Sequence, residues 1–260
     1  MDHTTPRSRW ARYRDLVIAL AWEDLKVRYK SPVLGFLWSL VTPLVLLITF
    51  SFVFTKVIHL EMANYPIYLL LGLFPWNFLS LSLLTGTTVF VSNARLVKNV
   101  AFPRLAIPIA IVLTQLVHYV LALALLLASL PLMGLRYPST CVWLPVVVAL
   151  QSCFILGLLL ICSALHVYLR DMKYIVEVGM TGWFYLTPIF YAPTMIPEPW
   201  RQVCMLNPMA ALVTLFRHVL LEPQTPWYDV GVYAAVASLA TCIVGVALFR
   251  RLAPRFADRV

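Results

Sequence analysis

Six long stretches of apolar residues, almost free of charged side chains, dominate the chain. An α-helix rises about 1.5 Å per residue and the hydrocarbon layer of a membrane is about 30 Å thick, so about 20 such residues can cross it. The fifth stretch is shorter and runs into Pro188, whose ring interrupts a helix. The pattern predicts an all-α integral membrane protein with six transmembrane helices, over residues 31–55, 67–91, 105–135, 141–169, 178–192 and 228–249.

The charges are few and unevenly placed. Of the 260 residues 62% are hydrophobic and 12% charged, and 20 Lys and Arg against 11 Asp and Glu leave a net charge of +9. With the amino terminus inside, sixteen basic residues fall on the inner side and four on the outer side. Because Lys and Arg gather on the cytoplasmic side of membrane proteins, we expect both termini in the cytoplasm. The basic residues only flank the helices, so they do not indicate a nucleic-acid partner.

The first thirty residues follow a different pattern. Apolar side chains recur at helical spacing, at Trp10, Tyr13, Leu16 and Leu20, with arginines between them. This is typical of a helix that lies on the membrane surface. We expect a cytoplasmic amphipathic interface helix over residues 1–30 and a six-span transmembrane domain over residues 31–260. A solvated basic tail is the alternative.

Within the apolar stretches the sequence offers little that could carry catalysis. It has no HExxH motif and no paired carboxylates, and GxxxxGK[ST] is excluded because none of the nine glycines precedes a lysine. The five cysteines stand singly, without the spacing of a zinc site. We interpret His118 and His166 as buried core residues. The chain is expected to bind no metal and no cofactor, so any use of ATP requires another protein.

Three segments outside the apolar stretches carry the remaining information. The loop SNARLVKNVAFPRLAIP has the form of a short docking helix that ends at Phe102 and Pro103, although a plain connector fits equally well. A basic cluster and a helix-starting Ser31 and Pro32 precede the first stretch in LKVRYKSPVLGFLWSLVTPL. A long segment rich in proline joins the fifth stretch to the sixth.

The order and spacing of short motifs then indicate a family. The motifs are RYKSPVLGFLW, NARLVKNVAFPR, LRDMKY, YLTPIFYAPTMIP, LNPM and LFRHVLL. Over about residues 12 to 252 the chain resembles the membrane subunit of ABC transporters of the polysaccharide and polyol-phosphate export family. The resemblance implies a homodimer that binds two nucleotide-binding subunits, which hold ATP and Mg²⁺. It also implies a bacterial inner-membrane location and export of a glycan carried on undecaprenyl diphosphate.

The resemblance also assigns roles to segments. It implies a coupling helix near residues 93–103 that sits on the ATPase, and short re-entrant periplasmic gate helices near residues 193–222. Both halves of the gate region, 195–205 and 209–221, are too short to span a membrane. The residues expected to contact the ATPase are Arg95, Leu96, Lys98, Phe102, Pro103 and Arg104.

Two further sets of residues suit a glycan pathway. Sugars present hydroxyls and apolar ring faces, so aromatic side chains near the helix ends are candidates to line a channel, with an ordinary interfacial belt as the alternative. A diphosphate headgroup requires cations at the cytoplasmic border, where Arg14, Arg28 and Lys30 are candidates or simple topology anchors. The aromatic candidates are Tyr65, Tyr68, Phe74, Trp76, Trp183, Phe184, Tyr185, Phe190 and Tyr191.

Other functions remain open from the sequence. An ABC permease for a drug or lipid would require an enclosed apolar pocket. A membrane transferase acting on lipid-linked sugars would require an acidic pair, and a structural scaffold is disfavoured mainly by the motif order. Among glycans, we expect O-antigen rather than capsule or a teichoic-acid-like polymer.

Overall fold

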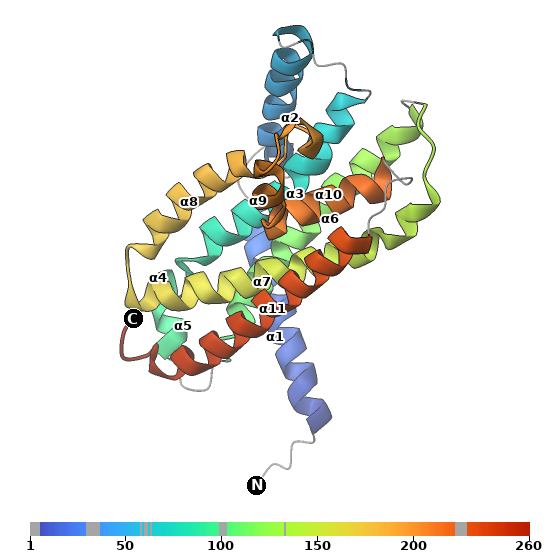
Figure 1. Ribbon diagram of the computed structural model, residues 1–260. Helices are drawn as coiled ribbons and strands as arrows, with labels where there is room; N and C mark the ends of the chain where they lie inside the picture. Colours follow the sequence, from blue (N-terminus) through green and yellow to red (C-terminus); the bar gives the residue numbers. More distant parts are fainter. Residues whose placement is uncertain are drawn as a thin grey trace.

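A computed structural model describes residues 6–29, 37–57, 59, 62, 64–98, 103–132, 134–221 and 228–260, and every regular element within them is helical. The main helices are drawn in Figure 1. They are α1 (Pro6–Tyr29), α2 (Leu37–Phe52), α3 (Tyr65–Gly86), α4 (Val89–Ser92), α5 (Ala94–Lys98), α6 (Ala106–Leu132), α7 (Leu144–Tyr168), α8 (Met172–Leu186), α9 (Trp200–Met205), α10 (Pro208–Leu220) and α11 (Tyr228–Leu252). A π-helical turn, Val53–Val57, extends α2, and 3₁₀ turns occupy Ser139–Trp143, Pro193–Met195 and Ala253–Arg255.

Four helical stretches in the described residues are long and apolar enough to cross a membrane, namely Tyr65–Gly86, Ala106–Pro131, Ser139–Tyr168 and Tyr228–Arg255. They correspond to the second, third, fourth and sixth predicted helices, and an all-helical membrane architecture is confirmed. The first prediction falls on α2 and its π-helical turn, but residues 30–36 lie outside the described part.

The fifth predicted helix begins earlier and ends sooner than the apolar pattern indicates. Residues 178–192 were expected to span, whereas α8 covers Met172–Leu186, 15 residues or about 22 Å. Lys173 in its first turn pairs at 3.9 Å with Glu177, which lies one turn further along the helix. The chain leaves the helix at Thr187, directly before Pro188, because the residue before a proline is disfavoured in the helical conformation.

Helices α7 and α11 lie side by side along most of their length (Figure 1). Glycines permit this close approach: a β-carbon at Gly157 would lie 2.5 Å from the backbone of Thr241, and one at Gly245 would collide with the carbonyl oxygen of Gly157. Small residues at helix contacts are typical of membrane proteins, where backbones pack closely.

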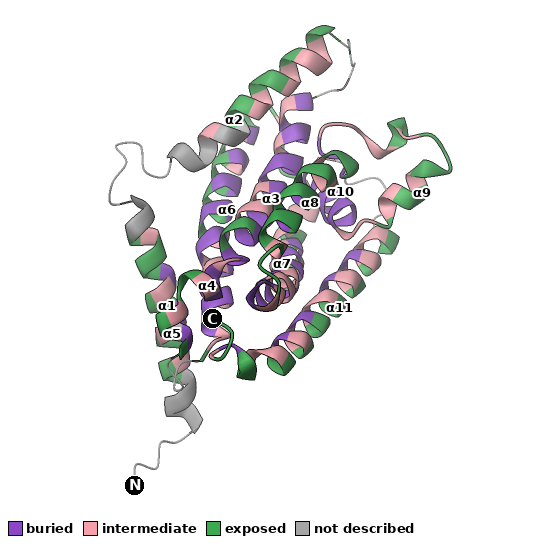
Figure 2. Cartoon of the chain, turned by 90° about the vertical axis from the view of Figure 1, so that its left-hand side faces the viewer, coloured by how far each residue is buried: buried purple, intermediate pink, exposed green. Residues whose placement is uncertain are grey.

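The short helix α10 lies in the core despite its external position in the sequence. All of its residues from Met209 to Leu220 except Thr214 are buried, and it contacts α3, α7 and α11. In Figure 2, α8 carries a wide exposed face, whereas α3 and α10 are mostly buried. The apolar core therefore centres on α3 and α10.

The predicted helix in the first thirty residues is present as α1. Val17 and Ala21 are buried against Ala106 and Ala110 at the start of α6, while Ile18 and Trp22 are exposed. Burial raises the pKa of the Tyr13 phenol on the same side of the helix. One face of α1 is thus fixed to the helical bundle.

Candidate functional site

Aromatic side chains from four segments meet in one cluster. The ring centroids of Trp76 and Phe184 are 5.5 Å apart, and those of Phe184 and Phe190 are 5.9 Å apart. Phe50 stacks on Phe190 at 5.1 Å. We call this set the aromatic cluster: Phe50, Phe54, Tyr65, Trp76, Trp183, Phe184, Tyr185, Phe190 and Tyr191.

The turn after α8, residues 187–191, is held to α3 by two tyrosine hydroxyls. Tyr65 donates to the carbonyl oxygen of Phe190 at 2.9 Å, and Tyr68 donates to that of Tyr191 at 3.3 Å. Both tyrosines are buried. Tyr191 in turn donates to the carbonyl oxygen of Tyr185 at 3.1 Å. These phenols position the backbone of the turn, while Tyr185, 58% exposed, presents its ring at the surface of the cluster.

The structure brings most of the predicted channel residues together but separates Phe74 from them. Phe74 faces a small pocket between α3 and α6, which Asn77, Gln115, His118 and Tyr119 also line. Phe50 and Phe54 join the cluster although the sequence did not single them out. They could have been found from their position four residues apart on one face of the first apolar stretch.

Arg217, on α10, is the best-connected polar side chain beside the cluster. Its guanidinium donates to the carbonyl oxygens of Pro188 at 2.6 Å, Ile189 at 2.5 Å and Tyr68 at 3.3 Å, and it lies 3.5 Å from the centre of the Tyr68 ring. The residue is only 2% exposed. A β-carbon at Gly72 would come within 3.0 Å of this guanidinium and 2.8 Å of the Ile189 carbonyl oxygen. Arg217 therefore ties α10, α3 and the 187–191 turn together.

Asn207 forms a second tie between the turn and α10. Its side-chain oxygen accepts from the backbone N–H of Met209 at 3.0 Å, which caps α10, and from the indole N–H of Trp183 at 2.9 Å. Its amide nitrogen donates to the hydroxyl of Thr187 at 3.0 Å. The LNPM motif thus encodes a helix cap that also orients one aromatic ring of the cluster.

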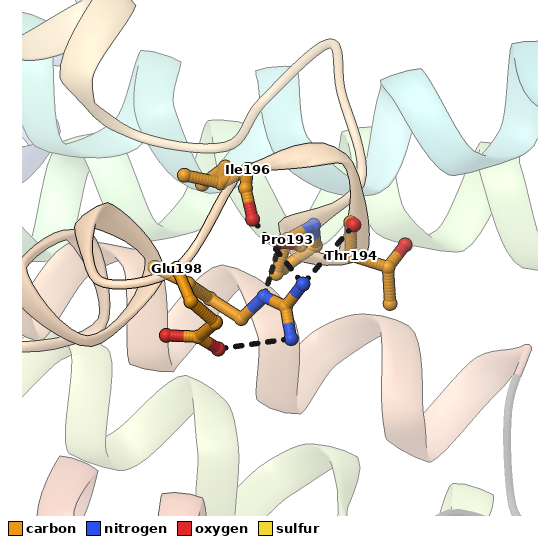
Figure 3. A network of polar contacts seen from close by, with 5 residues as sticks. Pro193, Thr194, Ile196 and Glu198 are labelled. Atoms are coloured by element: carbon orange, nitrogen blue, oxygen red, sulfur yellow. Dashed lines mark hydrogen bonds and ion pairs between the residues drawn. The ribbon is translucent and has the colours of Figure 1, made fainter.

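Residues 193–205 form a compact turn around Arg201. The guanidinium donates to the carbonyl oxygens of Pro193, Thr194 and Ile196 and pairs with Glu198 at 3.0 Å, as drawn in Figure 3. In the predicted gate region the structure thus has one short surface helix, α9, and one buried helix, α10.

The predicted docking loop contains a five-residue helix, α5, that buries one residue. Val97 is fully buried, whereas Arg95 and Lys98 are exposed. The side chain of Leu96 and all of Phe102 lie outside the described residues. Pro103 is exposed, but Arg104 turns inward and donates to the carbonyl oxygen of Ala253. Asn93 caps the preceding α4 through its side chain, which donates to the carbonyl oxygen of Val89 at 3.0 Å.

Comparison with known proteins assigns the family. A protein-family model described as "ABC-2 type transporter" matches residues 15–221. The chain belongs to this family. It is 33% identical over 245 residues to an "O-antigen export system permease protein RfbA" of Klebsiella pneumoniae, with 94% of each chain covered. Another RfbA, of Myxococcus xanthus, is 31% identical, with 96% of each chain covered. "Polysialic acid transport protein KpsM" of Escherichia coli is 25% identical, with 94% of this chain and 96% of the relative covered.

The resemblance to the membrane subunit of polysaccharide-exporting ABC transporters is therefore confirmed. In this ABC-2 permease the predicted headgroup residues lie on or beyond α1. Arg14 is exposed and pairs with Asp15 at 2.9 Å. The side chain of Arg28, and Lys30 altogether, lie outside the described residues. Among the described residues no group of three His, Cys, Asp or Glu could hold a metal ion.

Arg217 and Asn207 belong to this site, although neither was among the residues predicted for it from the sequence. Arg217 was counted only as an outer charge, and Asn207 only as part of a motif. The signal for Arg217 is its isolation, since it is the one Lys, Arg, Asp or Glu between residues 202 and 221. A charge in an apolar helix of a membrane protein is costly and usually has a specific partner.

Proposed function

We propose that this permease moves undecaprenyl-diphosphate-linked polysaccharide, O-antigen in particular, from the cytoplasmic to the periplasmic side of the bacterial inner membrane. The observation that carries the proposal is the similarity to proteins named O-antigen export permeases, which extends over 94–96% of the chain. The lower identity to a polysialic acid transport protein makes a capsular glycan the second choice.

The energy for export would come from a separate nucleotide-binding subunit that holds ATP and Mg²⁺. Two copies of that subunit would bind a permease dimer, each through α5. The exposure of Arg95 and Lys98 supports this arrangement, because two exposed cations on one short helix suit an acidic cleft. Both termini would lie in the cytoplasm on the same side as α5, as the distribution of Lys and Arg indicates.

The second permease copy would cover the exposed face of α8. Val178, Tyr185 and Leu186 are 58–74% exposed there, and a β-carbon at Gly179 or Gly182 would meet nothing. Val176 and Met180 on the opposite face are buried in the bundle. A helix with glycines on an open face at membrane depth permits close approach of another helix. The aromatic cluster borders this face through Tyr185, which would place the sugar path along the contact between the two copies.

The six transmembrane helices of the proposal would include α2 with its preceding residues and α8, beside the four long spans. The periplasmic gate would consist of α9 and α10. Asn207 and Arg217 tie α10 to the 187–191 turn, and Arg201 ties α9 to residues 193–196. At the opposite end, Arg14, Arg28 and Lys30 would gather the lipid diphosphate from the inner leaflet.

Deletion of the gene, followed by glycan analysis, tests the proposal. Loss of surface O-antigen, accumulation of the lipid-linked glycan inside the cell and restoration of both by the plasmid-borne gene are expected. Normal surface glycans in the deletion strain would reject export of a glycan. A change confined to drug resistance or lipid composition would favour the rival permease functions.

A further inference from the structure

The carboxyl-terminal residues Ala253–Val260, which we call the tail, do not simply end α11. Phe256 is fully buried. Its ring lies 5.1 Å from that of Phe90 on α4, 5.6 Å from that of Phe249 on α11 and 6.3 Å from that of Tyr168 at the end of α7. One tail residue therefore contacts three helices that are far apart in the sequence.

Three side chains from outside the tail donate to carbonyl oxygens at the end of α11 and within the tail. Tyr168 donates to Leu252 at 3.0 Å, Arg104 donates to Ala253, and Arg170 donates to Arg259 at 3.5 Å. Arg104 lies in the docking loop after α5, and Arg170 lies in the turn before α8. The guanidinium of Arg259 lies 6.0 Å from the Tyr168 ring. The tail is thus hydrogen-bonded to the docking loop and to the turn before α8.

The helix α5 belongs to the same apolar cluster as the tail. Fully buried Val97 of α5 shares this cluster with Phe90, Phe249 and Phe256, and Val260 packs against it. A five-residue helix is too short to be stable by itself, so its position depends on such tertiary contacts. In both views the carboxyl terminus lies close to α4 (Figures 1 and 2). The cluster also contains Ile107 of α6 and Val167 of α7, so a displacement of α5 would pass through it to the tail and to the long helices.

We propose that the tail is a brace that carries the displacement of α5 into α7, α8 and α11, with Phe256 as its positioning residue. The inference rests on the proposed function, in which an ATPase moves α5. The Phe256 ring fills the space between Phe90, Tyr168 and Phe249, so the cluster is a close-packed unit. Such packing transmits strain, whereas a cavity absorbs it. Without the Phe256 ring, a cavity in the cluster would absorb part of the displacement of α5 before it reached the long helices.

The test compares Phe256→Ala with Phe256→Leu and with the control Phe78→Ala. Leu fills most of the apolar volume, so it should restore the behaviour of the wild type. Phe78 is also buried and stacks on Tyr119 at 5.1 Å, but it lies outside the tail cluster. For each variant, folded complex with the nucleotide-binding subunit, ATP hydrolysis and surface glycan are measured, the last two per amount of complex.

The brace predicts that Phe256→Ala still hydrolyses ATP but exports about five-fold less glycan per complex or worse, the lower end of usual coupling effects. Phe256→Leu should export close to the wild-type amount, and Phe78→Ala should change only the amount of complex. Parallel loss of hydrolysis and export in Phe256→Ala, or unchanged export per complex, would overturn the brace.

A second measurement keeps this inference separate from the proposed function. Hydrogen exchange of the purified permease should show faster exchange of the amides of residues 89–98 in Phe256→Ala than in Phe78→Ala, whatever the substrate is. Equal exchange in the two variants would reject the brace by itself. If the wild-type permease supports no glycan export but the exchange difference is found, the proposed substrate is wrong and the brace stands.

Discussion

Removal of the Arg217 guanidinium should release the 187–191 turn from α3 and α10. In Arg217→Met the apolar stem is retained, but the carbonyl oxygens of Tyr68, Pro188 and Ile189 lose their donor. Each hydrogen bond to a charged donor contributes about 1.5–3 kcal/mol. The two short bonds alone give roughly 3 kcal/mol, taken at the lower value because removal of the cation also removes its desolvation cost.

A loss of about 3 kcal/mol corresponds to a decrease in the midpoint of thermal unfolding of about 6–12 °C for a protein of this size. Circular dichroism of the purified permease in detergent measures it. Arg217→Lys should lose an intermediate amount, because an ammonium keeps the charge without the planar fork that reaches two adjacent carbonyls.

Arg201→Met is the matched control. Arg201 also contacts three carbonyl oxygens, but its side chain is 38% exposed, so water replaces the lost bonds and the expected cost is below about 1 kcal/mol. If Arg217→Met unfolds within about one degree of the wild type, or if Arg201→Met is the more damaging variant, the reasoning that burial makes Arg217 the central tie is refuted.

Three further predictions follow from the site and the packing. Asn207→Ala should destabilise the permease by about 1–2 kcal/mol because α10 loses its cap, and Trp183 fluorescence should shift to the blue because the indole loses its hydrogen bond. Asn207→Asp keeps the acceptor, so it should retain most of the stability. Equal losses of stability in the two variants would contradict this. Gly245→Val should separate α7 from α11 and abolish the folded peak in size-exclusion chromatography. Ala247→Val, at an exposed position of α11, should leave that peak intact. A monodisperse Gly245→Val protein would show that the close contact between α7 and α11 is dispensable. Replacing Trp183, Tyr185 and Tyr191 together by Ala should lower surface glycan while the ATPase still assembles, and unchanged surface glycan would refute the aromatic path.

The hydrophobic pattern predicted the long helices well because length and composition decide membrane insertion. The ends of α6 and α11 fall within a few residues of the predicted ones. The fifth helix begins earlier than predicted, because Lys173 and Glu177 lie within its first two turns, where they pair and reach water. The position of these charges therefore does not mark the start of the helix.

The aromatic cluster could be predicted as a set of candidates but not as an assembly. Tyr65 and Phe190 are 125 positions apart, and only the fold brings the hydroxyl of one to the carbonyl of the other. The burial of α10 could not be predicted from the sequence either, because a length of 13 residues suits a surface helix as well as a core helix. The role of Phe256 depends on three partners from different helices, which no local pattern reveals.

ATP-dependent translocation in a defined system tests the central claim most directly. The permease and its nucleotide-binding subunit are reconstituted in proteoliposomes that carry lipid-linked O-antigen, with ATP added outside and a glycan-cleaving enzyme enclosed inside. The account predicts cleavage of the glycan that requires ATP, both subunits and an intact α5, and that is lost when Arg95 and Lys98 are replaced by Glu. ATP hydrolysis by the assembled complex with no glycan reaching the interior would contradict it.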